Sequence, residues 1–236
     1  CYISSGTWSL MGAEVKNPVI NDSCFDCNFT NEGGVGGTTR LLKNIAGLWL
    51  IQECRRIWSH QGEDWEWADF VKMAESATPC RYFFNPDESR FAAPSNMPRE
   101  IVAACAAAGQ GSPGSEAEIV RAAFDSLALR YRMVFDWTEQ LTGGTIETIH
   151  VVGGGVQNQL LCQMTADACQ RRVVAGPVEA TGIGNIVMQA IASGDVPSIS
   201  AARQIVQNSF EVREYLPRDS ALWNDAIGRF RDYFQG

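Results

Sequence analysis

The sequence predicts an α/β fold in which a mixed β-sheet is flanked by helices. The first 40 residues have the pattern of short strands punctuated by glycine. The middle of the chain has helical periodicity, and strands alternate with helices from about residue 145, which is typical of a partly parallel sheet. With 236 residues, 45% of them hydrophobic, the chain is long enough for one large globular domain or two small ones.

The opening residues are predicted to form a small antiparallel meander. The stretch "CYISSGTWSLMGAEV" indicates two strands joined by a tight turn at Gly6 or Thr7, and "CFDCNFTNEGGVGG" indicates a third. From Leu41, apolar residues recur at three- and four-residue steps, which predicts a helix to about Trp58. A second helix is expected from Glu66 to Ala77.

The centre of the chain begins with a proline-rich stretch, Thr78 to Pro98, that predicts an ordered loop with a short strand around Tyr82 to Phe84. A helix follows in "PREIVAACAAAG". A long helix is expected from Ser115 to Leu141, because its "SEAE" opening resembles a capping box. The remaining expected elements are strands Thr145 to Val152 and Arg172 to Ala175, and helices Gln157 to Cys169, Thr181 to Ser193, and from Ser198 and Ser220.

Charge and hydropathy exclude several classes of partner. The formal net charge is -8, whereas nucleic-acid binders need a concentrated basic surface. No apolar run approaches the roughly 18 residues that span a bilayer, and the first residues lack the pattern of a secretory signal. We therefore expect a cytoplasmic protein whose partners are small molecules or proteins, with no nucleic acid and no membrane.

The eight cysteines are scattered along the chain. Only Cys24 and Cys27 form a C-x-x-C, and the only histidines are His60 and His150, so a four-ligand zinc site is not favoured. We expect reduced thiols and no metal held by Cys24 and Cys27. The chain starts at Cys1 in what is already a strand pattern, which predicts that it is a piece of a longer polypeptide.

Three consecutive glycines, Gly153 to Gly155, follow the strand "TIHVV" and precede a helix. Backbone without Cβ atoms lets a ligand approach closely, and a helix N-terminus favours negative charge. The spacing is not the dinucleotide fingerprint, because the position of its last glycine holds Asn158. A turn that only lets the helix pack on the strand is the alternative.

Two other stretches carry polar groups that suit a ligand. In "SSGTWS", hydroxyls around one glycine can hold phosphate oxygens without positive charge, although an ordinary polar hairpin has the same pattern. On the expected helix after "NEGGVGG", Asn44 and Gln52 lie eight residues apart, about 12 Å along the axis. Their side chains either form hydrogen bonds within the core or point at ligands.

Seven stretches in order resemble the C-terminal half of the rhamnulokinase group of the FGGY carbohydrate-kinase family. They are "YISSGTWSLMG", "TNEGG", "LLKNIAGLWLIQ", "FDSLALRY", "HVVGGGVQNQLL", "TADAC" and "AGPVEATGIGNI". The resemblance covers nearly the whole chain. It implies that residues 1–236 form an actin-like ATPase (ribonuclease H-like) domain, the nucleotide-binding half of a kinase whose N-terminal sugar-binding domain is absent from this chain.

The resemblance also implies roles for individual residues. Gly154, with Gly153 and Gly155 beside it, would be the bare backbone against which ATP lies, and Asn158 would be a polar neighbour. Thr7 would hold a phosphate of ATP and Gln52 would reach the nucleotide. Asn44 would face the sugar, so that one helix spans the distance between sugar and nucleotide.

The implied reaction transfers the γ-phosphoryl group of ATP, with Mg²⁺, to the 1-hydroxyl of L-rhamnulose. In the family, the phosphate loop, the catalytic base and most sugar contacts precede the "YISSGTWS" strand, so no catalytic residue is expected in this chain and the chain alone should be inactive. Asp22, Asp26 and Glu32 are interpreted as solvated loop residues. A sister kinase for L-fuculose or L-xylulose, or a non-catalytic actin-like nucleotide-binding module, are the alternatives.

Five tryptophans could also be taken for a sugar-stacking platform. Their helical spacing and apolar neighbours favour core packing instead. They are Trp49, Trp58, Trp65, Trp67 and Trp137.

Overall fold

The computed structural model describes residues 1–234, which contain a seven-stranded mixed sheet with the order β3-β4-β2-β1-β5-β6-β7. The central strands β1, β5 and β6 are parallel, and the outer neighbours are antiparallel. The strands are β1 Tyr2–Ser5, β2 Trp8–Val15, β3 Thr30–Gly33, β4 Thr39–Ala46, β5 Thr148–Val152, β6 Arg172–Ala175 and β7 Arg213–Tyr215. The predicted α/β class with a mixed sheet is confirmed.

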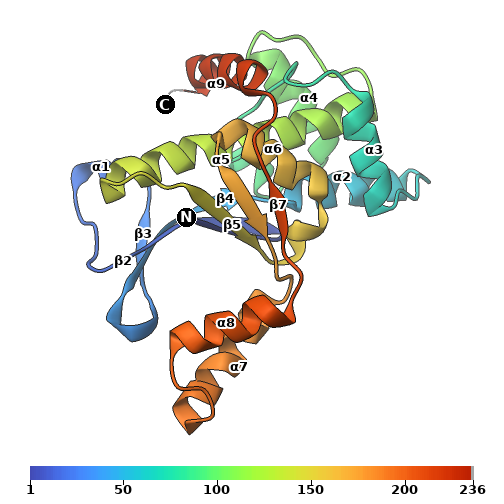
Figure 1. Cartoon of the computed structure of the whole chain (residues 1–236). Coiled ribbons are helices and arrows are strands. Elements are labelled where there is room, and N and C mark those ends of the chain that lie inside the picture. The colour runs from blue at the N-terminus through green and yellow to red at the C-terminus, as the bar shows by residue number, and fades with distance from the viewer. Residues whose placement is uncertain (235–236) are drawn as a thin grey trace.

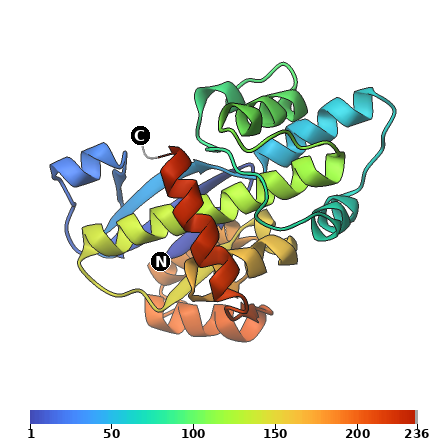
Figure 2. The ribbon, with the colours of Figure 1, turned by 90° about the horizontal axis from the view of Figure 1, so that it is seen from above.

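Most helices cover one face of this sheet, whereas α7 and α8 form a hairpin below the other face (Figure 1). Seen from above, α9 crosses over the long helix α5 (Figure 2). The helices are α1 Asp22–Asp26, α2 Trp49–His60, α3 Trp67–Ser76, α4 Met97–Ala107, α5 Glu116–Thr142, α6 Gln159–Cys169, α7 Ala180–Ser193, α8 Ile199–Ser209 and α9 Ser220–Phe234.

Helix α5 is the centre of the covered side. Its N-cap is Ser115, whose side chain accepts from the Glu118 N–H at 3.2 Å, and it ends at Gly143 in the left-handed region. On β5, Ile149 and Val151 are buried while His150 between them is exposed. This alternation shows that the helices bury only one face of the sheet.

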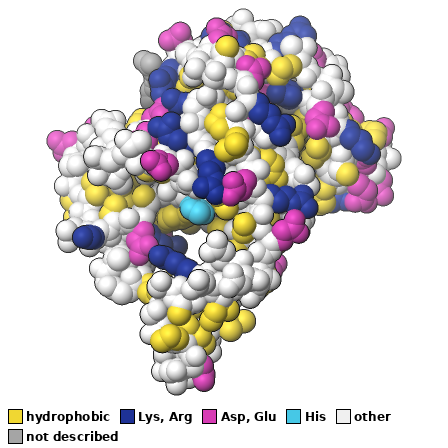
Figure 3. Space-filling view, viewed as in Figure 1, with side chains coloured by type: hydrophobic (Ala, Val, Ile, Leu, Met, Phe, Trp, Pro, Cys, Tyr) yellow, Lys and Arg dark blue, Asp and Glu magenta, His cyan; other side chains and the backbone are white. Residues whose placement is uncertain are grey.

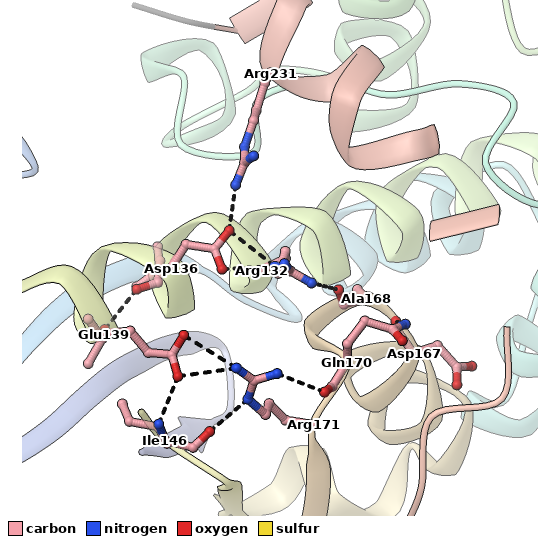
Figure 4. A network of polar contacts seen from close by, with 11 residues as sticks. Arg132, Asp136, Glu139, Ile146, Asp167, Ala168, Gln170, Arg171 and Arg231 are labelled. Carbon is pink, nitrogen blue, oxygen red and sulfur yellow. Dashed lines mark hydrogen bonds and ion pairs between the residues drawn. The ribbon is translucent and has the colours of Figure 1, made fainter. Parts of the chain in front are cut away.

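A polar network fastens α9, α5, α6 and the start of β5 together (Figure 4). Asp136 on α5 accepts from Arg132 of its own helix and from Arg231 of α9. Arg132 also donates to the Ala168 carbonyl of α6 at 2.9 Å. Arg171 donates to the Ile146 carbonyl at 2.7 Å and pairs with Glu139. These contacts fix the helical layer against the sheet.

The helix predicted from Leu41 to Trp58 is wrong in its first half. Residues 39–46 form β4, which pairs with β2 over eight positions, and helix α2 begins only at Trp49. Gly47 follows the strand, and the position requires glycine because a Cβ there would lie 2.7 Å from the carbonyl oxygens of both Gly6 and Thr7. Asn44 and Gln52 therefore do not share a helix, and the helical spacing of about 12 Å does not apply to them.

Smaller departures occur nearby. Residues 82–84 form no strand, since the Gln110 and Ser126 side chains accept from the Phe83 and Phe84 N–H groups. The "CFDC" stretch is the short helix α1, so only its downstream part is strand. The predicted core packing of the tryptophans fails for Trp67, which is 46% exposed.

Within the described residues, no helix is both long enough and apolar enough to cross a membrane. Each of the eight cysteines, all within residues 1–234, is a free thiol.

A buried carboxyl group on α5 holds the loop after α3 in place. Asp125, which is fully buried, accepts from the Cys80 N–H at 2.6 Å and from Arg121 Nε at 2.9 Å. Cys80 has a positive φ of 54°, so this bond stabilises a backbone conformation that is rare outside glycine. Burial raises the pKa of Asp125 to about 6, against the pull of Arg121 in the other direction.

We predict that Asp125 makes stability fall as the pH rises from about 4 to about 6. In that range the folded state binds the proton that the unfolded state has lost, so the free energy of unfolding decreases with pH. Relative to Asp125→Asn, the wild type should lose about 3 kcal/mol across this window. Urea unfolding at several pH values measures it. If the free energy of unfolding of the wild type, minus that of the variant, stays constant or increases with pH, the pKa of Asp125 is not raised.

Candidate functional site

Two of the loops singled out in the sequence leave the sheet at the same edge. Strands β1 and β5 are parallel neighbours, with Tyr2 opposite His150 and Ser4 opposite Val152. The Gly6–Thr7 turn after β1 and the glycine run after β5 therefore lie side by side. The edge at the carboxyl ends of parallel strands is where α/β proteins commonly bind ligands.

The three glycines have different surroundings. Gly153 has φ 89°, and a Cβ there would lie 2.7 Å from the Ser5 carbonyl oxygen. A Cβ at Gly155 would lie 2.0 Å from Ser5 Oγ. At Gly154, by contrast, a Cβ would meet nothing within 4 Å. Gly153 and Gly155 thus serve backbone packing on β1, while Gly154 faces open space.

Two backbone N–H groups at this edge are available to a ligand. Among the described residues, the N–H groups of Thr7 and Gly154, both exposed, donate to no backbone carbonyl or side chain. Free amides at an open surface favour an anion, because they supply partial positive charge without a cationic side chain. The arrangement suits the oxygens of a phosphate chain.

Helix α2 brings Gln52 to the hairpin turn. The N–H groups of Leu48 and Trp49, at the start of this helix, donate to the carbonyls of Gly6 and Thr7 at 3.0 and 2.9 Å. Gln52 Nε2 lies 3.2 Å from Thr7 Oγ1 and donates to it. The structure therefore brings together Thr7 and Gln52, which the sequence assigned to one ligand.

A buried tyrosine on α5 supports the hairpin formed by β1 and β2. The hydroxyls of Tyr131 on α5 and Ser9 on β2 are hydrogen-bonded at 2.7 Å, and both residues are buried. Ser9 pairs with Ser5 across the hairpin, so the bond lies directly under the Gly6–Thr7 turn. Burial raises the pKa of Tyr131 to about 12. The tyrosine stays neutral and keeps its hydrogen bond at physiological pH.

The other two residues predicted for the site, Asn158 and Asn44, lie on different elements. Asn158 is the N-cap of α6, and its side-chain oxygen accepts from the Leu161 N–H at 3.0 Å, which leaves its amide nitrogen for other contacts. Asn44 lies on β4 opposite Leu10, exposed on the sheet face that α5 does not cover. Asn44 reaches its position as a strand residue, not as part of the helix that carries Gln52.

The carboxylates near the meander do not fit a metal site. Glu32 is ion-paired with Arg40, and Asp22 and Asp26 are exposed on α1. Residues 1–234 contain no group of three or more His, Cys, Asp or Glu side chains placed to hold an ion.

Sequence reasoning missed two residues that shape the site, Gly47 and Tyr131, and it named Ser5 only as one of the hydroxyls of "SSGTWS", not as a packing partner of the glycines. Ser5 contacts two of the three glycines, and Gly47 lets α2 start against the hairpin. The signal for Gly47 was its place between an apolar run and a new helix. For Tyr131 there was none, because its partner lies 122 residues away in the sequence.

Comparison with known proteins identifies the family. Residues 1–193 match the model of the C-terminal domain of the FGGY family of carbohydrate kinases. The chain is 46% identical over 231 residues to a rhamnulokinase from Bacteroides thetaiotaomicron, covering 98% of this chain and 47% of that protein. A rhamnulokinase from Enterobacter sp. is 42% identical over 234 residues, covering 99% and 46%.

The chain belongs to the FGGY family of carbohydrate kinases. It spans about half the length of the relatives it matches. Solved structures of this family share its fold. A ligand-bound xylulose kinase from Lactobacillus acidophilus superposes with a TM-score of 0.72 at 14% identity, over 98% of this chain and 46% of that one. Plasmodium falciparum glycerol kinase with ADP superposes with a TM-score of 0.64 at 14% identity, over 97% of this chain and 46% of that one. The predicted actin-like ATPase fold is confirmed.

The different surroundings of the glycines lead to a prediction about stability. Gly155→Ala places a methyl group 2.6 Å from Ser5 Cβ, so it should destabilise the fold by about 1–3 kcal/mol through overpacking. Gly154→Ala is the matched control, and its free energy of unfolding should be unchanged or slightly higher. Chemical denaturation of both variants measures this. Equal losses at the two positions would mean that Gly154 is packed like its neighbours.

Proposed function

We propose that this chain is the nucleotide-binding half of an ATP-dependent sugar kinase. The observation that carries the proposal is the meeting of the Thr7 hairpin, Gln52 and the open Gly154 backbone at one edge of the sheet. Family membership and the ADP-bound relative support a nucleotide as the ligand.

In this proposal each group has a separate task. The amides of Thr7 and Gly154 hold phosphate oxygens, and the Thr7 hydroxyl, oriented by Gln52, holds another. The open space over Gly154 admits the nucleotide close to the backbone. Asn158 lines the same loop with its free amide nitrogen, and Asn44 faces the sugar from the uncovered side of β4.

The chain positions the donor but does not complete the reaction. Phosphoryl transfer needs a base for the acceptor hydroxyl and counter-charge for the phosphates, usually as Mg²⁺. We assign both to polypeptide outside this chain, together with most sugar contacts. ATP supplies the γ-phosphoryl group, and the residues described here bind and orient it.

For the acceptor we propose the 1-hydroxyl of L-rhamnulose, because the two relatives at 46% and 42% identity are rhamnulokinases. Sister kinases for L-fuculose or L-xylulose remain the alternatives within the family. A non-catalytic nucleotide-binding module is the alternative outside it.

A substitution at Gly154 tests the nucleotide site in the complete protein. Gly154→Val should raise the KM for ATP at least about tenfold, or ~1.4 kcal/mol, because the side chain fills the space that the nucleotide needs. Sugar affinity without nucleotide and the melting temperature should hardly change, since the position is sterically open.

Gly144→Val is the matched control, because Gly144 is exposed and also has no neighbour within 4 Å. Its ATP kinetics should match the wild type. Unchanged ATP kinetics in a stable Gly154→Val protein would remove the glycine run from the nucleotide site.

A coupled assay tests the division of labour. The complete protein should phosphorylate L-rhamnulose with a higher kcat/KM than L-fuculose or L-xylulose, and this 236-residue chain alone should show no turnover above background. Turnover by the chain alone would show that the base lies within it. Preference for another sugar would overturn only the choice of substrate.

A further inference from the structure

The segment of residues 85–91, between α3 and α4, holds the junction of β4 and α2 from both sides. Before the junction, Asp87 Oδ1 accepts from the N–H of Ala46, the last residue of β4, at 2.8 Å. After it, the indole N–H of Trp49, the first residue of α2, donates to the Phe91 carbonyl at 2.9 Å. Only two residues separate Ala46 from Trp49. The segment therefore fixes where the strand ends and where the helix begins.

Asp87 takes the place of a strand partner at the outer edge of β4. In the described part of the chain, β3 pairs with β4 only from Thr39 to Leu42. Ala46 lies four residues further on and is buried. A buried backbone N–H without an acceptor costs free energy, so this position needs one. The side chain of Asp87 supplies it where β4 meets the ligand edge of the sheet.

A charge pair fixes the side chain of Asp87. Its second carboxylate oxygen, Oδ2, accepts from Arg130 Nε at 2.8 Å, and the two side chains are 20% and 10% exposed. Arg130 also lies over the Trp137 ring, 5.0 Å from its centroid. Asn85 Oδ1 accepts from the Asp87 N–H at 3.1 Å, which fixes the backbone. Because charge-assisted bonds are stronger than neutral ones, the carboxylate is held firmly against Ala46.

The junction that Asp87 holds carries part of the candidate site. Backbone N–H groups at the start of α2 donate to the two carbonyls of the hairpin turn. One helical turn later, Gln52 donates to the Thr7 hydroxyl at 3.2 Å. A shift of Ala46 would move the start of α2 and with it Gln52. Displacements of about 1 Å at a positioned group are enough to weaken its action strongly.

Asp87 acts on this site from the helix-covered side of the sheet. Its side chain bonds to Ala46 and to Arg130, which belongs to α5. The open face of the sheet, which α5 does not cover, carries a groove of about 1790 Å³ beside α7 and α8 (Figure 3). Asp87 is therefore no part of that groove, and its influence on a ligand passes through Ala46 and α2.

We propose that Asp87 is a positioning residue for the nucleotide. By accepting from Ala46 it sets the start of α2, and thereby the place of Gln52 against Thr7. The inference rests on the proposed function, in which Thr7 and Gln52 hold ATP. It assigns a role to a segment that is far from the site in the sequence.

Two double variants of the complete protein test this. Asp87→Ala and Asp87→Asn are each combined with Arg130→Met, so that no buried guanidinium is left without its partner. Only the Asn variant keeps an oxygen that can accept from the Ala46 N–H. The KM for ATP of the Ala variant should be at least about fivefold higher than that of the Asn variant. Sugar affinity without nucleotide should be equal in the two, because Asn44 is held by the pairing of β4 with β2.

Glu88→Ala is the matched control, because Glu88 is the neighbouring acid but pairs with Arg90 at 2.8 Å instead. Its KM for ATP should equal that of the wild type. Equal KM values for ATP in the two double variants would make Asp87 a structural residue only and overturn the proposal. A loss of sugar affinity as large as the loss for ATP would also overturn it, since the effect would then be general.

Asp87→Glu covers the case in which the double variants do not fold. It keeps the negative charge beside Arg130 but lengthens the side chain by a methylene group, which displaces the acceptor from Ala46. The KM for ATP should rise in this stable protein while sugar affinity stays the same. An unchanged KM for ATP would contradict the proposal.

The unsubstituted complete protein and Gly154→Val separate this inference from the proposed function. If Gly154→Val raises the KM for ATP and the Asp87 variants do not, the inference fails alone. If the unsubstituted protein does not bind ATP, as measured by calorimetry, the proposed function itself fails.

Discussion

The site depends on the parallel pairing of β1 with β5. That pairing brings a hairpin turn near the start of the chain beside a glycine run some 150 residues later. It is held at its end by the contact of Ser5 with Gly153 and Gly155, which tolerates no Cβ at either glycine. Gly154, between them, is left facing open space. The β1–β5 pair therefore provides both the close packing at Gly153 and Gly155 and the open space at Gly154.

The surroundings of this contact are rigid. Tyr131 holds the hairpin from the helical layer, and α2 docks on it through two backbone hydrogen bonds next to Gly47. The network around Asp136 and Arg132 fixes that layer to α6, which begins directly after the glycine loop. Rigid support of this kind reduces the reorganisation needed when a charged ligand binds. The other face of the sheet has no comparable cover, and there the chain presents α7 and its groove.

Much of this fold was predictable from local pattern. Strand β6 was predicted with its observed bounds, and α6 and α7 within two residues, because their periods are clear and their ends carry glycine or asparagine. Strand β4 was not, because Lys43 interrupts its alternation. Its side chain is buried, donates to the Cys27 carbonyl at 2.9 Å and lies over the Trp137 ring. Leu41 and Ile45 then fit a helical period as well as a strand period.

The site, like the fold, was only partly predictable from the sequence. Thr7, Gln52 and Gly154 could be chosen from residue type and family resemblance, and the structure brings them to one edge. The separate tasks of the three glycines could not be read from "GGG", since they depend on how Ser5 lies against each one. The support from Tyr131 could not be predicted either, because it is a contact between segments that are distant in the sequence.

The central claim is that the nucleotide lies against the Thr7 hairpin and the Gly154 backbone. A crystal structure of the complete protein with a non-hydrolysable ATP analogue tests it most directly. The account predicts phosphate oxygens within hydrogen-bonding distance, about 2.7–3.2 Å, of the Thr7 and Gly154 amides. A nucleotide bound in contact with neither residue would contradict it.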